Sequence, residues 1–401
     1  MSACAASSGG STVSVVRCSS YAPHEVGRAV GAVLRPLGGM GSFVAAGERI
    51  GLKPNLLMAV PPEKAITTHP AVVEQVAVRM REAGASPVVM ESPGVAFANS
   101  ARALRHVYER TGIWDVVQRL ELEVCLNNVG VGTPHPSGSL MKRLDVLTAA
   151  LEVEGLVSVC KLKTHTFMTY TGAVKNLFGL IAGMSKGGYH AKLADPSRFA
   201  DMLLDVASFI RPRVSLMDAV CALEGDGPGT AGRPRFVGAL LASADPVALD
   251  AVACRLAGID AKRVPVLVQA AKRGLPGADP QAVEIVGEDF EGLDGDGLAL
   301  PSPREGDRLG FGVFRGLSGV LLPVARGALN PRPRPREGRC IACRACERAC
   351  PKGAITVRGN LARVDDSLCI RCFCCHELCP AAAIDLAFVG VARIARALHL
   401  V

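Results

Sequence analysis

Eight of the fifteen cysteines form two copies of one spacing near the end of the chain, and this repeat constrains the fold more than any other feature. In each copy, three cysteines are separated by two residues, and a fourth follows after three more residues and precedes a proline. The copies are Cys340, Cys343, Cys346, Cys350 and Cys369, Cys372, Cys375, Cys379. Three thiolates at this spacing can bind one face of an iron-sulfur cube, and the fourth ligates the other cube of a pair. The repeat therefore predicts two [4Fe-4S] clusters that pass single electrons.

The crossed arrangement divides the eight thiolates into two ligand sets. These sets are Cys340, Cys343, Cys346 with Cys379, and Cys369, Cys372, Cys375 with Cys350. Cys374 is a competing ligand beside Cys375, but the repeated spacing selects Cys375. Structural zinc is the main alternative, although four ligands per ion do not require a run of this form given twice. A disulfide framework is less favoured, because the first residues lack the basic start and apolar core of a signal peptide.

Residues 337–386, which hold this repeat, resemble the bacterial-type two-cluster ferredoxins. The resemblance implies a small pseudo-twofold βαββαβ unit, an α+β module. After each Cys-Pro pair comes a short apolar stretch of strand-like composition, KGAITV or AAAIDL. Basic residues outnumber acidic ones between 339 and 385. This charge balance favours docking of an acidic electron donor, and we expect a redox partner protein that acts as electron donor or acceptor.

The composition of the chain limits what the residues outside this module can form. The chain of 401 residues leaves room for a sizeable upstream core, in which 49% apolar and only 4% aromatic residues indicate Ala, Val and Leu packing. No run reaches the roughly eighteen apolar residues that a transmembrane helix needs. The net charge of +8 is not gathered in a basic stripe, so nucleic acid is not an expected partner. Abundant free thiols favour a cytoplasmic location.

Alternating apolar runs and amphipathic helices predict an α/β domain with a mostly parallel sheet over residues 13–300. Residues 1–12 are small and polar, and we expect them to be disordered. Residues 301–336 read as a linker that contains a short apolar helix, and the Pro/Arg-rich end at 331–336 reads as a stiff, extended spacer. Residues 387–401 predict a basic amphipathic helix that docks on the protein or lies on a membrane surface.

The upstream domain resembles the prokaryotic family known as domain of unknown function 362, over about residues 48–260. The motifs that carry the resemblance are KPN at 53–55, TTHP at 67–70, KLKTH at 161–165, TGAVKNLFG at 171–179, EGDGP at 224–228 and DPVALD at 245–250. Members of this family are often fused to a two-cluster ferredoxin module. The family carries no settled reaction, so the resemblance implies the architecture more than the chemistry.

Polar residues collect where the predicted strands end, which is where open parallel sheets bind ligands. The candidates for binding an anionic substrate or a nucleotide phosphate are Lys53, Asn55, Lys161, Lys175 and Asn176. Glycines at 172, 179, 183, 187 and 188 either help backbone amides to approach an anion or only shape turns. The sequence shows no flavin or nicotinamide motif.

His165, His69 and Lys163 are the candidate catalytic residues. Imidazole titrates nearest to neutral pH, and His165 stands beside two lysines in the KLKTH motif. His69 stands at a predicted helix start, where a structural hydrogen bond is the simpler role. Asp245 is most simply a helix cap.

These observations favour an iron-sulfur oxidoreductase. The clusters would feed electrons to an anionic small-molecule substrate in the α/β domain. Two alternatives remain open: a non-catalytic electron carrier or adaptor that docks a partner protein, and a factor for metal or cofactor assembly.

Overall fold

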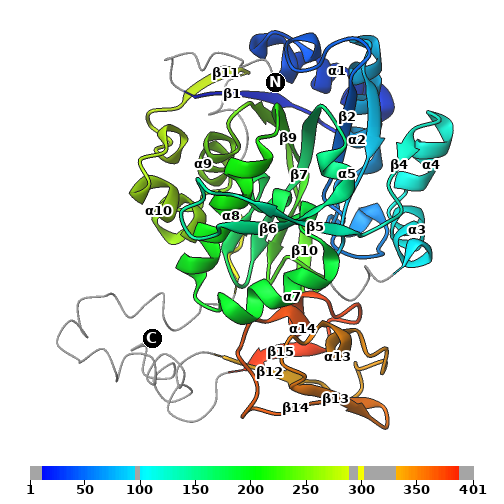
Figure 1. Cartoon of the computed structure of the whole chain (residues 1–401), viewed down its shortest axis with the longest axis vertical. Coiled ribbons are helices and arrows are strands. Elements are labelled where there is room, and N and C mark those ends of the chain that lie inside the picture. Colours follow the sequence, from blue (N-terminus) through cyan, green and yellow to red (C-terminus); the bar gives the residue numbers. More distant parts are fainter. Residues whose placement is uncertain (1–10, 95–99, 289–296, 302–330, 388–401) are drawn as a thin grey trace.

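The computed structural model describes residues 11–94, 100–288, 297–301 and 331–387. It consists of a large α/β domain and a small cysteine-rich module at one end of it (Figure 1). The predicted fold class, a mostly parallel sheet with a ferredoxin-like module, is confirmed.

The α/β domain is built on a nine-stranded sheet with the order β11-β1-β10-β9-β7-β2-β3-β4. The strands are β1 (Thr12–Arg17), β2 (Arg49–Pro54), β3 (Ser86–Val89), β4 (Glu123–Val124), β7 (Gly155–His165), β8 (Thr169–Thr171), β9 (Val214–Gly225), β10 (Gly232–Ser243) and β11 (Glu284–Gly287). Strands β9, β7, β2, β3 and β4 pair in parallel, β10 runs antiparallel to β9 and β1, and β8 folds back on β7. The parallel strands therefore end at one common edge.

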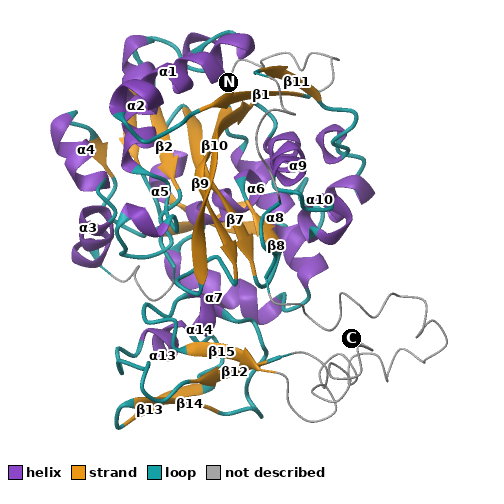
Figure 2. Ribbon diagram, turned by 180° about the vertical axis from the view of Figure 1, so that it is seen from behind, coloured by secondary structure: helices purple, strands orange, loops and turns teal. Residues whose placement is uncertain are grey.

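Helices cover both faces of the sheet (Figure 2). One hydrophobic core lies under α1 (Pro23–Leu34), α2 (Pro70–Glu82), α3 (Ala101–Arg110) and α4 (Ile113–Arg119). The opposite core lies under α6 (Ala173–Asn176), α8 (Pro196–Ile210), α9 (Pro246–Leu256) and α10 (Pro265–Lys272). Leu52 and Leu156 on adjacent strands point to opposite cores, as the alternation of strand side chains requires.

The remaining elements connect these layers. They are α5 (Thr148–Leu151), α7 (Gly183–Lys192), the hairpin of β5 (Gly130–Pro134) with β6 (Arg143–Leu147), and the 3₁₀ helices Arg35–Leu37, Met40–Ser42, Pro62–Lys64, Leu177–Leu180, Ala261–Arg263 and Pro276–Ala278. Asp245 caps α9 as predicted, since its carboxylate accepts from the amides of Val247 and Ala248. The cap of α2 is His69, whose side chain accepts a hydrogen bond from the amide of Ala71.

The cysteine-rich module has the predicted βαββαβ order. Its elements are β12 (Arg332–Pro335), α13 (Ala345–Ala349), β13 (Ile355–Arg358), β14 (Leu361–Val364), α14 (Cys374–Glu377) and β15 (Ile384–Ala387). Strand β12 pairs antiparallel with β15, and β13 pairs antiparallel with β14.

The spacer predicted at residues 331–336 is wrong, because most of this segment is strand β12. A two-stranded sheet leaves one side of each strand unpaired, so prolines are tolerated there. The guanidinium groups of Arg332 and Arg334 bind the carboxylate of Asp366, which holds the strand in the module. The module therefore begins at Arg332 rather than at residue 337.

Several other predicted segments fall outside the described residues. The predicted helices in the linker and at the C-terminus lie there, and so does most of the predicted disordered N-terminus; Thr12 itself begins β1. Within the described part of the chain, no helix is both long and apolar enough to cross a membrane.

The module packs against the carboxyl-terminal edge of the parallel strands. Ala345, Ala349 and Leu378 of the module share a small apolar cluster with residues that follow β2 and end β9, namely Met58, Val60, Ile66 and Leu223. The edge at which an α/β sheet usually binds ligands is thus covered by the cysteine-rich module.

Candidate functional site

The cysteines of the module surround two cavities. Cys340, Cys343, Cys346 and Cys379 line the first, and Cys369, Cys372, Cys375 and Cys350 line the second, so each crossed set surrounds one cavity. Among the described residues, no three His, Cys, Asp or Glu side chains lie close enough together to ligate one metal ion. A zinc ion needs four ligands that converge on one point, whereas a multi-iron cluster needs thiols arranged around a larger space. The arrangement of these cysteines suits the cluster better.

The two cysteine loops repeat the same unusual backbone. Ala342 and Arg344 in the first loop have φ values of 52° and 59°, and Arg371 and Phe373 in the second have 57° and 62°. Side chains other than glycine rarely adopt such positive values, which cost free energy. The matching pairs show that both loops curl in the same way to turn three cysteines toward one cavity.

The fourth cysteine of each copy receives a matched hydrogen bond. The backbone amide of Ala354 donates to Cys350 Sγ, and that of Ala383 donates to Cys379 Sγ, both at 3.2 Å. Amide hydrogen bonds to cluster sulfurs are among the features that set the reduction potential. The fourth cysteine of each copy therefore accepts the same kind of backbone hydrogen bond.

A third cavity, of about 90 Å³, lies at the carboxyl-terminal edge of the sheet and is called here the strand-end cavity. A buried water needs about 10–15 Å³, so this cavity has room for a small molecule. Both units supply its walls. They are Asn55, Leu56, Leu57, Glu91, Ser92, Pro93, Gly94, Lys175, Asn176, Phe178, Gly179, Lys186 and His190 from the α/β domain, and Cys374, Glu377 and Leu378 from the module.

Cys374 lines both the second cysteine cavity and the strand-end cavity. Its neighbour Cys375 is one of the four cysteines that the crossed spacing assigns to the second cavity. Cys374 therefore stands between the two cavities and belongs to the lining of both.

A buried ion pair adjoins the strand-end cavity: Glu91 lines it, and Lys53 lies behind Glu91 and is not part of the lining. The Lys53 ammonium lies 2.6 Å from Glu91 Oε2 and also donates to Asn176 Oδ1 at 3.1 Å. Burial lowers the pKa of Lys53 and raises the pKa of Glu91, and the charge of each partner opposes the shift of the other. A Cβ on Gly179 would lie 2.1 Å from Glu91 Oε1, so this glycine leaves room for the pair.

Asn55 joins the ion pair to Lys163. Its Nδ2 donates to Asn176 Oδ1 at 3.2 Å, while its Oδ1 accepts from the Lys163 ammonium at 2.5 Å. Lys163 also donates to the carbonyl of Ile66 and does not itself line the cavity. Burial, followed by the nearby charges of Lys175 and Lys161, holds the pKa of Lys163 well below its usual value.

Asp250 positions the helix that carries Lys175 and Asn176. Its carboxylate accepts from the amides of Ala173 at 2.6 Å and Val174 at 3.0 Å, at the start of α6. The motifs TGAVKNLFG and DPVALD, which lie about 70 residues apart in the sequence, therefore meet at this contact. One acidic side chain fixes the orientation of two cavity residues.

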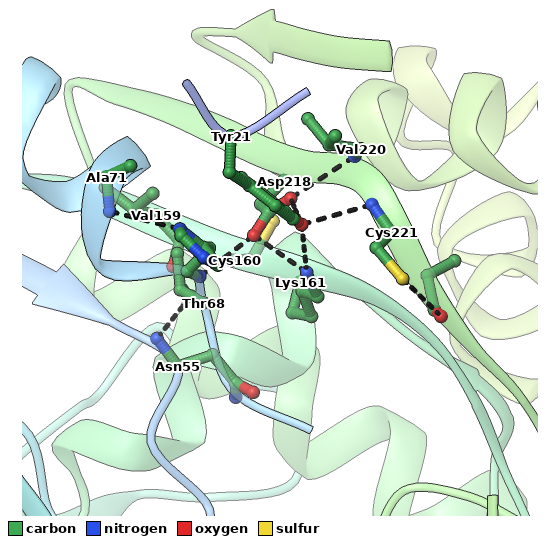
Figure 3. A network of polar contacts seen from close by, with 12 residues as sticks. Tyr21, Asn55, Thr68, Ala71, Val159, Cys160, Lys161, Asp218, Val220 and Cys221 are labelled. Carbon is green, nitrogen blue, oxygen red and sulfur yellow. Dashed lines mark hydrogen bonds and ion pairs between the residues drawn. The ribbon is translucent and has the colours of Figure 1, made fainter. Parts of the chain in front are cut away.

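Lys161 and His69 belong to a separate polar network. Figure 3 shows the Lys161 ammonium between Tyr21 and Asp218, 2.9 Å from the hydroxyl and 2.8 Å from Oδ2. The His69 ring stacks on Tyr21 at 3.6 Å, and its Nδ1 accepts from the amide of Ala71. Burial lowers the pKa of His69 to about 4. None of these four side chains lines the strand-end cavity, so their contacts serve to join β7, β9 and the start of α2.

His165 is fully buried at the end of β7 and close to the module. Its Nδ1 accepts from the amides of Phe167 and Met168 and lies 3.5 Å from Glu377 Oε1. Like Lys163, His165 is not among the residues that line the strand-end cavity. The three candidate catalytic residues are thus separated: His69 lies in the second network, and His165 and Lys163 lie behind the walls.

Five polar residues that line the cavity were not predicted from the sequence: Glu91, Ser92, Lys186, His190 and Glu377. The Lys186 ammonium donates to the carbonyls of Ser92 and Pro93, and burial lowers its pKa to about 7. In the stretch GMSKGG, the glycines alone were considered as possible contacts to an anion. Gly187 and Gly188 lie inside helix α7. A lysine and a histidine four residues apart on one helix were the signal available for Lys186 and His190.

The fold and these cavities define a class of protein: an α/β domain whose ligand edge is closed by a ferredoxin-like module. Residues 50–255 match the family model described as "Domain of unknown function (DUF362)", and residues 333–356 match the "4Fe-4S binding domain". The chain therefore belongs to the DUF362 family and carries a 4Fe-4S domain after it.

One relative and one solved structure extend this comparison. The chain is 35% identical over 275 residues to the "Thylakoid-associated protein sll1697" of Synechocystis, an alignment that covers 68% of this chain and 82% of that protein. The lactate racemase apoprotein of Thermoanaerobacterium thermosaccharolyticum matches with a TM-score of 0.40 and 15% identity over 62% of this chain. The match spans only 57% of the racemase chain.

Proposed function

We propose that this protein is an iron-sulfur reductase in which two [4Fe-4S] clusters supply electrons to an anionic small molecule held in the strand-end cavity. The observation that carries the proposal is the position of Cys374, which lines both the second cysteine cavity and the strand-end cavity. A redox site and a substrate site with one residue between them suit direct electron transfer.

The two crossed cysteine sets would hold the clusters. When bound, each cluster supplies one electron at a time. The amides of Ala354 and Ala383 donate to Cys350 and Cys379, and these hydrogen bonds favour the more negative, reduced state. The chain itself therefore provides thiolates, hydrogen bonds and a closed environment.

The far side of the module suits an electron-donor protein. Among the described cysteines, Cys343 alone is exposed, and Ile341 beside it is 64% exposed. The exposed charged residues of the module are mostly basic: Arg336, Arg339, Arg344, Arg348, Lys352, Arg358 and Arg363, against Glu337 and Asp365. An acidic one-electron carrier would be attracted to the basic module, and docking beside Cys343 and Arg344 would bring it nearest to the first cysteine set.

Anaerobic purification tests the proposal. We expect about eight irons and eight sulfides per chain, and paramagnetic signals after reduction with dithionite. A small molecule that co-purifies, or whose addition shifts those signals, supports the reductase.

The adaptor alternative predicts a different result. In that case a partner protein would bind tightly, and no small molecule would alter the cluster signals. Zinc in place of iron, or fewer than about six irons, would contradict both readings.

A further inference from the structure

The strand-end cavity contains an ammonium group without a direct ion pair. Lys175 lines the cavity, and its Nζ makes no hydrogen bond or ion pair with any of the described residues. Glu91 binds Lys53 at 2.6 Å, and the charge of Glu377 attracts Lys175 without direct contact. An enclosed ammonium without a hydrogen bond is costly, so its position suits a bound anion.

Two further polar side chains of the cavity lack partners within the described part of the chain. Ser92 is 1% exposed and its Oγ makes no hydrogen bond. His190 is 7% exposed and its Nδ1 makes none either. Buried polar atoms of this kind are normally satisfied, and here both residues line the same space as Lys175.

The charges of the walls limit the ligand to a small net charge. The Lys53–Glu91 pair is neutral as a unit. Lys175 and Lys186 are then balanced only by Glu377, which leaves an excess of one positive charge when both lysines are protonated. A monoanion matches this excess, whereas a dianionic phosphate exceeds it and lies beside two carboxylates.

We propose that the strand-end cavity binds the carboxylate group of a small organic monoacid. Lys175 is its counter-ion, and Ser92 and His190 are its hydrogen-bond partners. Lys186 adds a second positive charge and, because its ammonium already donates to two carbonyls, is held in place as a positioning residue. This inference rests on the proposed function for the identity of the site and deepens it by naming the chemical class of the substrate.

His190 also sets the shape of the site. Its ring stacks on Phe199 at 4.5 Å and lies near Phe178, at 6.1 Å between centroids. Burial lowers the pKa of His190 to about 3, so the ring stays neutral at ordinary pH. Phe178 and Leu57 line the cavity as well, so an apolar wall stands beside the cationic one. This arrangement suits a carboxylate with a short hydrocarbon or carbonyl-bearing group.

The test measures binding to the anaerobic holoprotein by calorimetry at pH 6.5, where the Lys186 ammonium is largely protonated. The probes are acetate, pyruvate and crotonate, with acetamide and crotonamide as neutral matches and sulfate as the dianionic competitor. We expect at least one carboxylate to bind more than tenfold more tightly than its amide and than sulfate. Equal binding of acid and amide, tighter binding of sulfate, or no binding of any carboxylate would overturn the proposal.

Variants link the binding to Lys175. Lys175→Met should weaken carboxylate binding at least tenfold, and Lys175→Arg should retain part of it. Lys192→Met removes a charge from the exposed end of α7 and should have no effect. Unchanged binding in Lys175→Met with normal unfolding behaviour would overturn the assignment.

The two proposals fail in distinguishable ways. Iron content and reduction by dithionite test the clusters without any ligand. If carboxylates bind but the cluster signals do not respond, the carboxylate site is supported and the proposed reductase activity is contradicted. If another molecule shifts the signals while no carboxylate binds, the reductase activity is supported and the carboxylate site is contradicted.

Discussion

The Thr230 hydroxyl donates a 2.5 Å hydrogen bond to the backbone carbonyl of Cys379. Thr230 lies between β9 and β10 of the α/β domain, and Cys379 is the last cysteine of the repeat in the module. Next to this contact, a Cβ on Gly229 would lie 2.0 Å from the carbonyl oxygen of Glu377. The backbone of a predicted cluster ligand is thus held directly by the domain that contains the strand-end cavity.

Loss of this hydrogen bond should loosen the module. Thr230→Val keeps a similar size but removes the donor, which should cost roughly 1 kcal/mol and speed amide hydrogen exchange in α14. Gly229→Ala should have a larger effect, because backbone atoms must move. Thr356→Val on the exposed strand β13 is the control, and equal exchange in all variants would contradict the contact's role.

The crossed cysteine sets predict which cysteine variants alter the same cluster and therefore have similar paramagnetic resonance spectra. Cys379→Ser and Cys340→Ser should each disturb the same cluster, and Cys369→Ser the other, as judged by paramagnetic resonance of the reduced protein. Cys374→Ser should keep about eight irons, because the repeated spacing selects Cys375 as the ligand. A match between the spectra of Cys379→Ser and Cys369→Ser would instead indicate uncrossed sets.

The buried pair of Lys53 and Glu91 should be strongly coupled. Lys53→Met leaves a buried carboxylate without its partner, so the free energy of unfolding should fall by about 3–5 kcal/mol in urea titrations. The double variant Lys53→Met with Glu91→Leu should recover a large part of this loss. Glu82→Gln, in an exposed ion pair with Arg79, should change stability by less than about 1 kcal/mol. Additive losses in the double variant would show that the pair is not coupled.

Lys186 should make stability depend on pH. Its pKa is about 7 in the folded protein, where burial outweighs the attraction of Glu91, and Lys53 and Lys175 lower it further. The unfolded chain keeps the proton up to about pH 10, so it binds more protons than the folded protein above pH 7. The wild type should therefore gain stability relative to Lys186→Met as pH rises from 7 to 9, by up to about 1.4 kcal/mol per pH unit.

Urea unfolding of both proteins at several pH values measures this difference. Lys192→Met, which lacks an exposed charge only, should show a difference from the wild type that does not vary with pH. A constant difference for Lys186→Met as well would mean that Lys186 titrates normally in the folded state.

Charge reversal on the module should slow its reduction by an acidic electron donor. Arg339→Glu with Arg344→Glu alters the exposed face near Cys343. We expect the second-order rate of reduction by an acidic ferredoxin to fall about tenfold at low salt, and the loss to shrink at high salt. Reduction by dithionite should not change. Arg358→Glu with Arg363→Glu, on β13 and β14, is the matched control, and equal slowing by both pairs would argue against a specific entry face.

Local patterns along the chain predicted the fold class of both units. The alternation of apolar runs predicted the parallel sheet, and Asp245-Pro246 predicted the start of α9, because these features depend on backbone geometry over a few residues. The cysteine spacing predicted two crossed sets for the same reason. Residues 331–336 were misjudged because pairing with β15, a contact about 50 residues away, overrides their low strand propensity.

Only the tertiary structure decides which residues line the strand-end cavity. The KLKTH motif contributes Lys161 to the network with Tyr21 and Asp218, and places Lys163 behind Asn55, although both lysines looked equally suited to a ligand. Lys175 faces the cavity because Asp250 holds the start of α6.

Sequence alone thus predicted the fold class, the cysteine sets and the family, because spacing along the chain controls hydrogen bonding and ligand geometry within one element. Which lysines meet an open space, and that Cys374 lines two cavities, followed from the order of the strands and the docking of the module. Such contacts join residues as far apart as Met58 and Leu378, so burial and pairing in three dimensions decide them.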